Sequence, residues 1–171
     1  MKDLSKYDHA AADYYLKSGL KTIPLMSWEF QQQFINDLQT TRSDAERLKK
    51  LAKAFRWKSN WDYESELMQQ CTIIVTDAAL SIVFASKNMA KMNGYKETEI
   101  LGKSPKMFQG KDTDLQVSKA IREAISNQQP FEKTILNYRK NGTTYDCHVL
   151  GFPVFNNEGK LSHFIAFEKA A

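Results

Sequence analysis

Residues 131–167 read FEKTILNYRKNGTTYDCHVLGFPVFNNEGKLSHFIAF and contain three runs rich in β-branched and aromatic residues. Two short polar segments separate these runs, and each holds the asparagine and glycine residues that are typical of tight turns. Connections this short join antiparallel neighbours, because parallel strands need a crossover of about a dozen residues or more. We therefore expect strands at 131–138, 144–155 and 161–167 in one antiparallel sheet.

Two further β-rich runs, at 72–75 and 81–84, precede a region of short helical patterns. Helices are expected at 87–93, 96–101 and 112–127. The apolar side of the last one would carry Leu115, Val117, Ala120, Ile121 and Ile125. The order of elements predicts an α+β fold, a five-stranded antiparallel sheet with helices on one face.

The first 70 residues have a different pattern, because their apolar residues recur at helical spacing. They predict helices at 4–18, 28–40 and 61–70, and another that begins at Ser43. Ser43 and Glu46 have the spacing of a capping box, in which each side chain satisfies a backbone donor at a helix start. We expect a helical N-terminal extension at 1–70 and a sheet domain at 71–171.

The composition, 42% hydrophobic and 26% charged, is that of a soluble globular protein. The sequence contains neither an apolar run of about 18 residues nor a signal-peptide core, so we expect a cytoplasmic protein without a membrane span. Cys71 and Cys147 are too few and too far apart for a disulfide framework or a zinc site, and the three histidines form no metal-binding motif. Free thiols and no bound metal are expected.

Enzyme motifs are missing from the sequence. It has neither a GxxxxGK[ST] phosphate loop nor a GxSxG elbow, and no output domain follows the last strand. We therefore expect no enzymatic activity. Output would act through the N-terminal helices, through self-association or on a separate protein.

Several blocks between residues 71 and 168 resemble, in the same order, a PAS domain of the LOV (light-oxygen-voltage) subfamily. These blocks are VTD at 75–77, AS at 85–86, MNGY at 92–95, EILG at 99–102, FQGKDTD at 108–114, NYRKNGT at 137–143 and FIAFE at 164–168. The resemblance implies a PAS fold that binds FMN against the inner face of its sheet. In this family a cysteine thiol joins the flavin when blue light is absorbed.

The position of that cysteine is altered here. The family motif is G-x-N-C-R-F-L-Q, and the matching stretch at 102–109 is GKSPKMFQ, which places Pro105 at the reactive position. Proline has neither a thiol nor a backbone N–H. The resemblance therefore implies that no cysteinyl-flavin adduct forms at this position.

Five other positions correspond to polar flavin contacts of the family. Gln109 and Asn137 are retained, whereas Lys106 replaces an arginine and lacks its planar fork. Cys147 replaces an asparagine with a weakly hydrogen-bonding thiol, and Glu168 replaces a glutamine and donates only when protonated, which burial favours. Two interpretations stay open: a retained FMN, or a pocket that is collapsed or holds another small ligand.

These residues also have structural interpretations. Cys147 is favoured as a small buried residue, and Lys106 as a plain surface lysine. His148 would point to the opposite face of the strand from Cys147 and is favoured as a surface histidine, while His163 has no visible partner. Glu168 is either solvated near the end of an edge strand or part of the pocket.

Three functions follow from these observations. The first is a sensory PAS module that lacks adduct photochemistry, forms a homodimer and contacts a signalling partner through its helices; a flavin sensor without the cysteine is its alternative form. The second is a DNA-binding regulator that uses the basic stretch 42–58, although Asp44 and Glu46 interrupt it and favour an ordinary amphipathic helix, so nucleic-acid binding is disfavoured. The third is an interaction module without a ligand.

Overall fold

The computed structural model describes residues 28–59, 61–69 and 71–171. The helix predicted at 4–18 lies outside the described residues. The chain divides into two compact units, Met1–Thr40 and Thr41–Ala171. The second unit contains the sheet.

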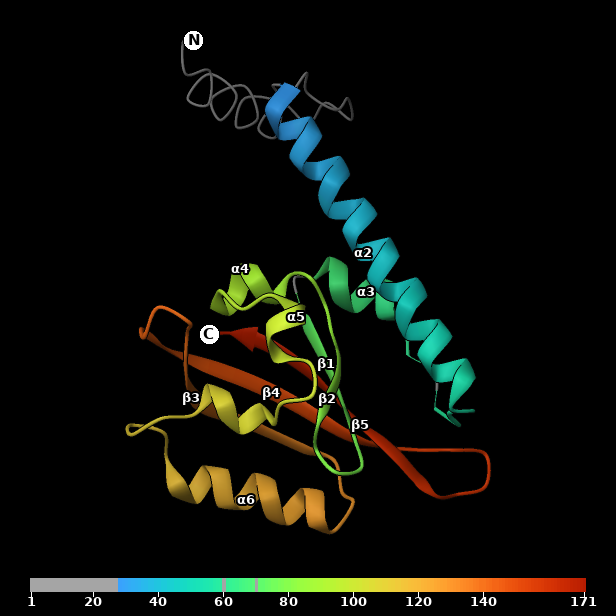
Figure 1. Cartoon of the computed structure of the whole chain (residues 1–171), viewed down its shortest axis with the longest axis vertical. Helices are drawn as coiled ribbons and strands as arrows, with labels where there is room; N and C mark the ends of the chain where they lie inside the picture. Colours follow the sequence, from blue (N-terminus) through green and yellow to red (C-terminus); the bar gives the residue numbers. More distant parts are fainter. Residues whose placement is uncertain (1–27, 60, 70) are drawn as a thin grey trace, which may run out of the picture. The chain divides into compact units, whose positions relative to one another are not determined.

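The sheet has five antiparallel strands in the order β2-β1-β5-β4-β3 (Figure 1), which confirms the predicted fold. Its strands are β1 (Thr72–Asp77), β2 (Ile82–Ala85), β3 (Phe131–Tyr138), β4 (Thr144–Phe155) and β5 (Leu161–Ala170). The last strand continues past its predicted end at 167. Since β5 lies between β1 and β4, Glu168 belongs to the central strand, and its interpretation as a solvated edge residue is wrong.

The segment between β2 and β3 forms the predicted helices on one face, which we call the inner face. They are α4 (Met89–Asn93), α5 (Glu97–Ile100) and α6 (Leu115–Ser126), and a 3₁₀ turn that was not predicted, η1 (Pro105–Phe108), lies between α5 and α6. Asp114 caps α6 by accepting hydrogen bonds from the backbone N–H groups of Gln116 and Val117. Leu115, in the first turn, is 83% exposed, so its predicted place on the apolar side of α6 is wrong.

Residues 28–54 form one continuous helix, α2 (Trp28–Ala54), instead of the two predicted. Ser43 and Glu46 lie inside it, so the predicted capping box is wrong. A capping box satisfies the free N–H groups at a helix start, and these groups are already bonded in a helix interior. Glu46 forms an ion pair with Arg42 one turn earlier, at 3.7 Å.

The outer face of the sheet is covered by the second half of α2 and by α3 (Tyr63–Met68). Ala45 and Leu48 of α2 and Tyr63 and Leu67 of α3 are buried in one core with sheet residues. These sheet residues are Ile73, Val75, Phe84, Val154, Ile165 and Phe167. The helices before residue 70 therefore share a hydrophobic core with the sheet, while the predicted domain boundary at residue 70 itself stays a prediction.

Candidate functional site

A cavity of about 140 Å³ lies between the inner face of the sheet, η1 and α6. Its apolar walls come from the sheet and from α6. They include Ile74, Ile135, Val149 and Phe164 from the strands, and Ile121 and Ile125 from the helix. None of the α6 side chains is fully buried. The helix therefore shields the cavity with side chains that are at most half-buried.

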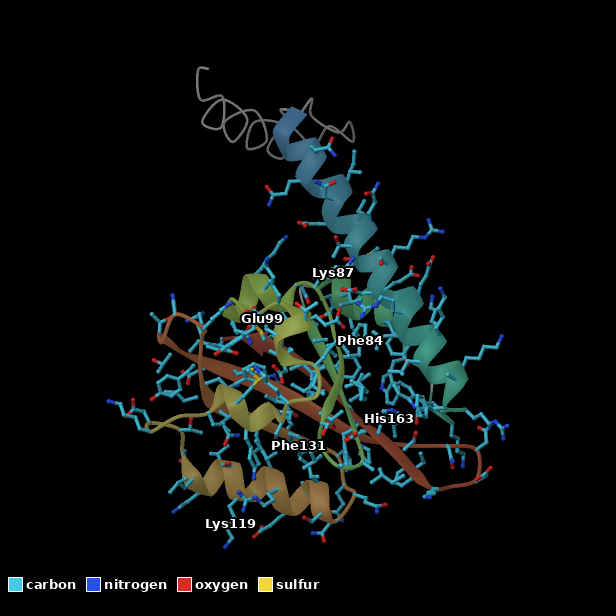
Figure 2. All side chains as sticks on the ribbon, viewed as in Figure 1. Phe84, Lys87, Glu99, Lys119, Phe131 and His163 are labelled. Atoms are coloured by element: carbon cyan, nitrogen blue, oxygen red, sulfur yellow. The ribbon has the colours of Figure 1, made fainter. Side chains whose placement is uncertain are left out.

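Phe131 forms another part of the wall, at the start of β3 (Figure 2). Its cross-strand neighbour on β4 is Gly151. A Cβ atom at residue 151 would collide with the Phe131 ring, so glycine lets the ring pack directly against the backbone of β4, and a larger residue would displace it.

Buried polar side chains also face the cavity. Asn137 on β3 and Glu168 on β5 line it with exposed fractions of 5% and 6%. Side chains alternate between the two faces of a strand, so Glu168 shares the inner face with Phe164 and Ala166. Thr76 on β1 lines the cavity as well, and its buried hydroxyl has no hydrogen-bond partner among the residues that the structure describes. The sequence predicted roles for Asn137 and Glu168 but missed Thr76.

The carboxyl group of Glu168 accepts a hydrogen bond from the thiol of Cys147, with 3.6 Å between Oε2 and Sγ. Burial raises the pKa of Glu168 to about 7, and the thiol hydrogen bond opposes this effect. Burial also raises the pKa of Cys147 strongly. The predicted burial of Cys147 is confirmed, and the thiol stays neutral near pH 7.

Tyr145, two residues before Cys147 on the same face of β4, is also buried. Its hydroxyl group and the side-chain nitrogen of Asn93 in α4 are both buried, and among the described residues neither has a hydrogen bond of good geometry, although Asn93 and Asn137 lie close enough to the phenol to influence its pKa. Burial raises the pKa of the Tyr145 phenol. This part of the inner face is thus polar but neutral.

Positive charges line the cavity at η1 and α6. Pro105 begins η1, and Lys106 follows it with an exposed side chain that contributes to the lining. Arg122 of α6 is a second cation in the lining, which the sequence reasoning missed. Its spacing of three residues from Ile125 places both on one side of the helix, and this was the available signal. Gln109, after η1, accepts a hydrogen bond from Ser118 at 3.1 Å.

The five residues predicted to contact a flavin are therefore gathered around one region. Asn137, Gln109, Lys106 and Glu168 line the cavity, together with Pro105. Cys147 does not line it but lies behind Asn137 and Glu168, which do. Apolar walls, neutral hydrogen-bonding groups and two cations suit a planar heteroaromatic ring with an anionic substituent.

A polar cluster of Asp44, Arg47 and Glu97 links α2 to the segment after β2, and we call it the α2 clasp. Asp44, only 1% exposed, accepts a hydrogen bond from the backbone N–H of Lys87 at 2.6 Å. Arg47 pairs with Asp44 at 3.2 Å and with Glu97 of α5 at 2.6 Å. Glu97 also accepts from the backbone N–H of Ala85 at 3.2 Å. The clasp thus connects the outer-face helix to the start of the inner-face helices.

His148 and His163 lie in different environments, one on the surface and one in the interior. His148 pairs with Glu132 at 3.0 Å on the surface, as the alternation along β4 predicted. His163 is only 3% exposed and accepts a hydrogen bond from the indole nitrogen of Trp57 at 3.1 Å. The expectation that His163 has no partner is therefore wrong.

Ion pairs with acidic residues neutralise several of the basic side chains in the stretch 42–58. The ion pairs are Arg42–Glu46, Arg47–Asp44, Arg47–Glu97, Lys49–Glu64 and Arg56–Glu158. A nucleic-acid site needs cations that are available to phosphates. This pairing does not favour DNA binding. Among the described residues, no helix is long and apolar enough to cross a membrane.

Comparison with known proteins finds one family and a set of photoreceptor relatives. The family model of the PAS domain matches residues 69–169. The chain is 38% identical over 98 residues to protein TWIN LOV 1 of Arabidopsis thaliana, which covers 55% of this chain and 25% of that protein. It is 35% identical over 85 residues to a blue-light-activated histidine kinase of Brucella canis, covering 50% of this chain and 17% of the kinase. The chain thus spans a quarter or less of the length of these relatives.

Solved structures of LOV domains share the fold. The dark structure of the blue-light photoreceptor Aureochrome1 LOV superposes with a TM-score of 0.60 and 26% identity, covering 67% of this chain and 86% of that one. The LOV domain from the Erythrobacter litoralis EL346 blue-light activated histidine kinase gives a TM-score of 0.56 and 23% identity, covering 58% and 94%. The second similarity concerns the fold alone.

Proposed function

Since the chain belongs to the PAS domain family and its relatives place it with the LOV type, we propose that it is a sensory signalling domain that binds a flavin without forming a cysteinyl adduct. The carrying observation is the cavity in which buried Asn137, Thr76 and Glu168 face Pro105 and two cations. Its role in signalling would be sensing and relay, and the kinase activity named for some relatives belongs to those longer proteins.

FMN is the ligand that this set of residues fits. Lys106 and Arg122 would hold its phosphate, because both cations line the cavity. Asn137, Gln109, Thr76 and Glu168 would bind the polar edge of the ring system. When bound, the flavin would supply absorption of blue light.

Binding requires the cavity to enlarge. A cavity of about 150 Å³ accommodates a single benzene-sized ring, and the cavity here measures about 140 Å³. A three-ring flavin would therefore need a wider cavity, and we infer that α6, whose side chains are at most half-buried, is the wall that would move outward. Ligand binding would thus change the position of an element on the inner face.

The signal would leave through α2. The α2 clasp holds this helix to the backbone of Ala85 at the end of β2 and of Lys87 just before α4. A change in the inner-face helices would therefore alter the contacts that hold α2. The clasp is thus the contact through which a movement of the inner-face helices would reach α2.

The same helix offers a surface for a homodimer or a protein partner. In its first half, Phe34, Ile35 and Leu38 are 58%, 45% and 38% exposed. Their spacing of three and four residues places them on one side of the helix. Exposed apolar side chains gathered in this way are typical of interaction sites.

The visible absorption spectrum of the chain, purified after expression with riboflavin available, tests flavin binding. A structured flavin band that remains through gel filtration would support the proposal, and titration with FMN would give its Kd. A colourless protein that also fails to bind added FMN would contradict it. The chain would then be better described as a PAS interaction module.

A further inference from the structure

Glu168 is a buried acid in the centre of the sheet, and the described part of the chain gives it no basic partner. Its side chain is 6% exposed and lines the cavity. Among the residues that the structure describes, its side-chain hydrogen-bond partner is the Cys147 thiol, which is a weak donor. Burying an ionised carboxylate with only a weak donor costs free energy, so the proton tends to remain on the acid.

The groups around Glu168 do not supply a compensating charge. Tyr145 and Cys147 on β4 and Cys71 before β1 are buried acids that are neutral near pH 7, and Asn137 on β3 is uncharged. Lys169 and His148 follow inner-face residues directly and therefore point to the outer face. Lys106 and Arg122 line the cavity, but within the described part of the chain neither forms an ion pair with Glu168.

We propose that Glu168 makes ligand binding in the cavity dependent on pH. Its protonated carboxyl donates a hydrogen bond to a carbonyl oxygen of a neutral heteroaromatic ring, whereas the ionised carboxylate presents only acceptors and repels that oxygen. The inference rests on the proposed flavin function, because a flavin ring carries such carbonyl groups. The protein with protonated Glu168 is therefore the form that binds the ligand. The hydrogen bond from the Cys147 thiol helps to set the pH at which half of the Glu168 side chains are ionised.

The size of the effect follows from linkage. A ligand that binds only the protonated form loses about tenfold in affinity for each pH unit above the pKa of the carboxyl. Binding also takes up protons from solution in that pH range. Both effects vanish when the side chain cannot ionise.

Riboflavin is the suitable probe, since FMN carries a phosphate whose own second ionisation lies near pH 6. We would measure the Kd of riboflavin between pH 6 and pH 9 by quenching of flavin fluorescence. The expected result is constant affinity at the acidic end and a fall of about tenfold per unit at the alkaline end. Calorimetry in two buffers of different ionisation enthalpy would count the protons taken up.

Three variants identify the titrating group. Glu168→Gln keeps a donor but has no proton to lose, so its riboflavin Kd should not change over this pH range. Cys147→Ala removes the donor that stabilises the carboxylate, so the midpoint should move to higher pH. His148→Gln is the matched control, because His148 follows Cys147 on the same strand but lies on the outer face, paired with Glu132.

The outcomes separate this inference from the proposed function. If riboflavin binds with the same Kd from pH 6 to pH 9, the proposed pH dependence is overturned while flavin binding stands. The same pH profile in Glu168→Gln as in the unmodified chain would also overturn the role of Glu168. If neither the unmodified chain nor Glu168→Gln binds riboflavin or FMN at any pH, the proposed function is overturned, and the pH dependence proposed here falls with it.

Discussion

The indole nitrogen of Trp57 donates a hydrogen bond to Nδ1 of His163 at 3.1 Å, joining the segment after α2 to β5. The Ser162 hydroxyl lies 2.7 Å from the same ring nitrogen. Nδ1 can accept from Trp57 only when the imidazole is neutral, with its proton on Nε2. The ring of Phe55 contacts the imidazole edge-on, with centroids 4.5 Å apart. The end of α2 is therefore held to the sheet by a neutral histidine.

Acidification should weaken this attachment. Burial lowers the pKa of His163 below its ordinary value of 6.5. As the pH falls, the histidine of the unfolded chain is therefore protonated before that of the folded chain. The stability contributed by neutral His163 is present above pH 6.5 and is lost as the pH falls through the lowered pKa. Urea unfolding at pH 7.5 and pH 5 should show a larger loss of stability for the unmodified chain than for His163→Gln. Equal losses in the two proteins would contradict this prediction.

The α2 clasp should contribute measurably to stability through Asp44. Asp44→Asn should lower the free energy of unfolding by roughly 1.5–3 kcal/mol, because it weakens hydrogen bonds to a charged, buried carboxylate. Glu46→Gln is the matched control on the same helix, where an exposed pair with Arg42 contributes at most about 1 kcal/mol. Urea unfolding of both variants checks this. A loss for Asp44→Asn no greater than for the control would argue against a structural role of the clasp.

Local patterns predicted the strands well, because their signals lie within a few residues. The ends of β3 and β4 match the expectation, since alternating side chains and Asn-Gly turns define them locally. The continuity of α2 was missed because a capping-box spacing also occurs by chance inside a helix. The partner of His163 was missed because Trp57 lies 106 residues away in the sequence.

The candidate site could be predicted only in part. The family resemblance identified Asn137, Gln109 and Glu168, and the structure brings them to one cavity. The burial of Glu168 could not be read from its position near the end of the chain, because it depends on β5 pairing with both β1 and β4. The contribution of Arg122 depends on which side of α6 faces the sheet, and this is a tertiary property.

Glu168 should make the ligand-free protein less stable as the pH rises. Its folded pKa of about 7 lies above the ordinary value of 4.5, so the folded state binds the proton more tightly. The associated stability is present below pH 4.5 and lost as the pH rises through about 7, a total of roughly 3 kcal/mol. Compared with Glu168→Gln, the unmodified chain should therefore lose more stability between pH 5 and pH 8 in urea unfolding. A constant difference between the two proteins over this range would refute the raised pKa.

Association through the first half of α2 is testable by mass. We expect the full chain to have the mass of a dimer in light scattering, and the double substitution Phe34→Glu with Leu38→Glu to give a monomer. Charged residues at both positions make burial of this helix side against a second copy unfavourable. Leu115→Glu is the matched control, because Leu115 is a large exposed apolar residue on α6. A monomeric unmodified chain, or a double variant that remains dimeric, would exclude this interface.

Pro105→Cys should give the flavin-loaded chain the thiol that its family uses. Pro105 lines the cavity at the start of η1, so a cysteine there would introduce a thiol at the cavity wall. Illumination with blue light should then bleach the visible flavin band, followed by recovery in the dark, whereas the unmodified chain should not undergo this cycle. Pro105→Ala is the matched control, because it restores the backbone N–H without adding a thiol. Bound flavin in Pro105→Cys that responds to light as it does in Pro105→Ala would show that residue 105 is not positioned for this chemistry.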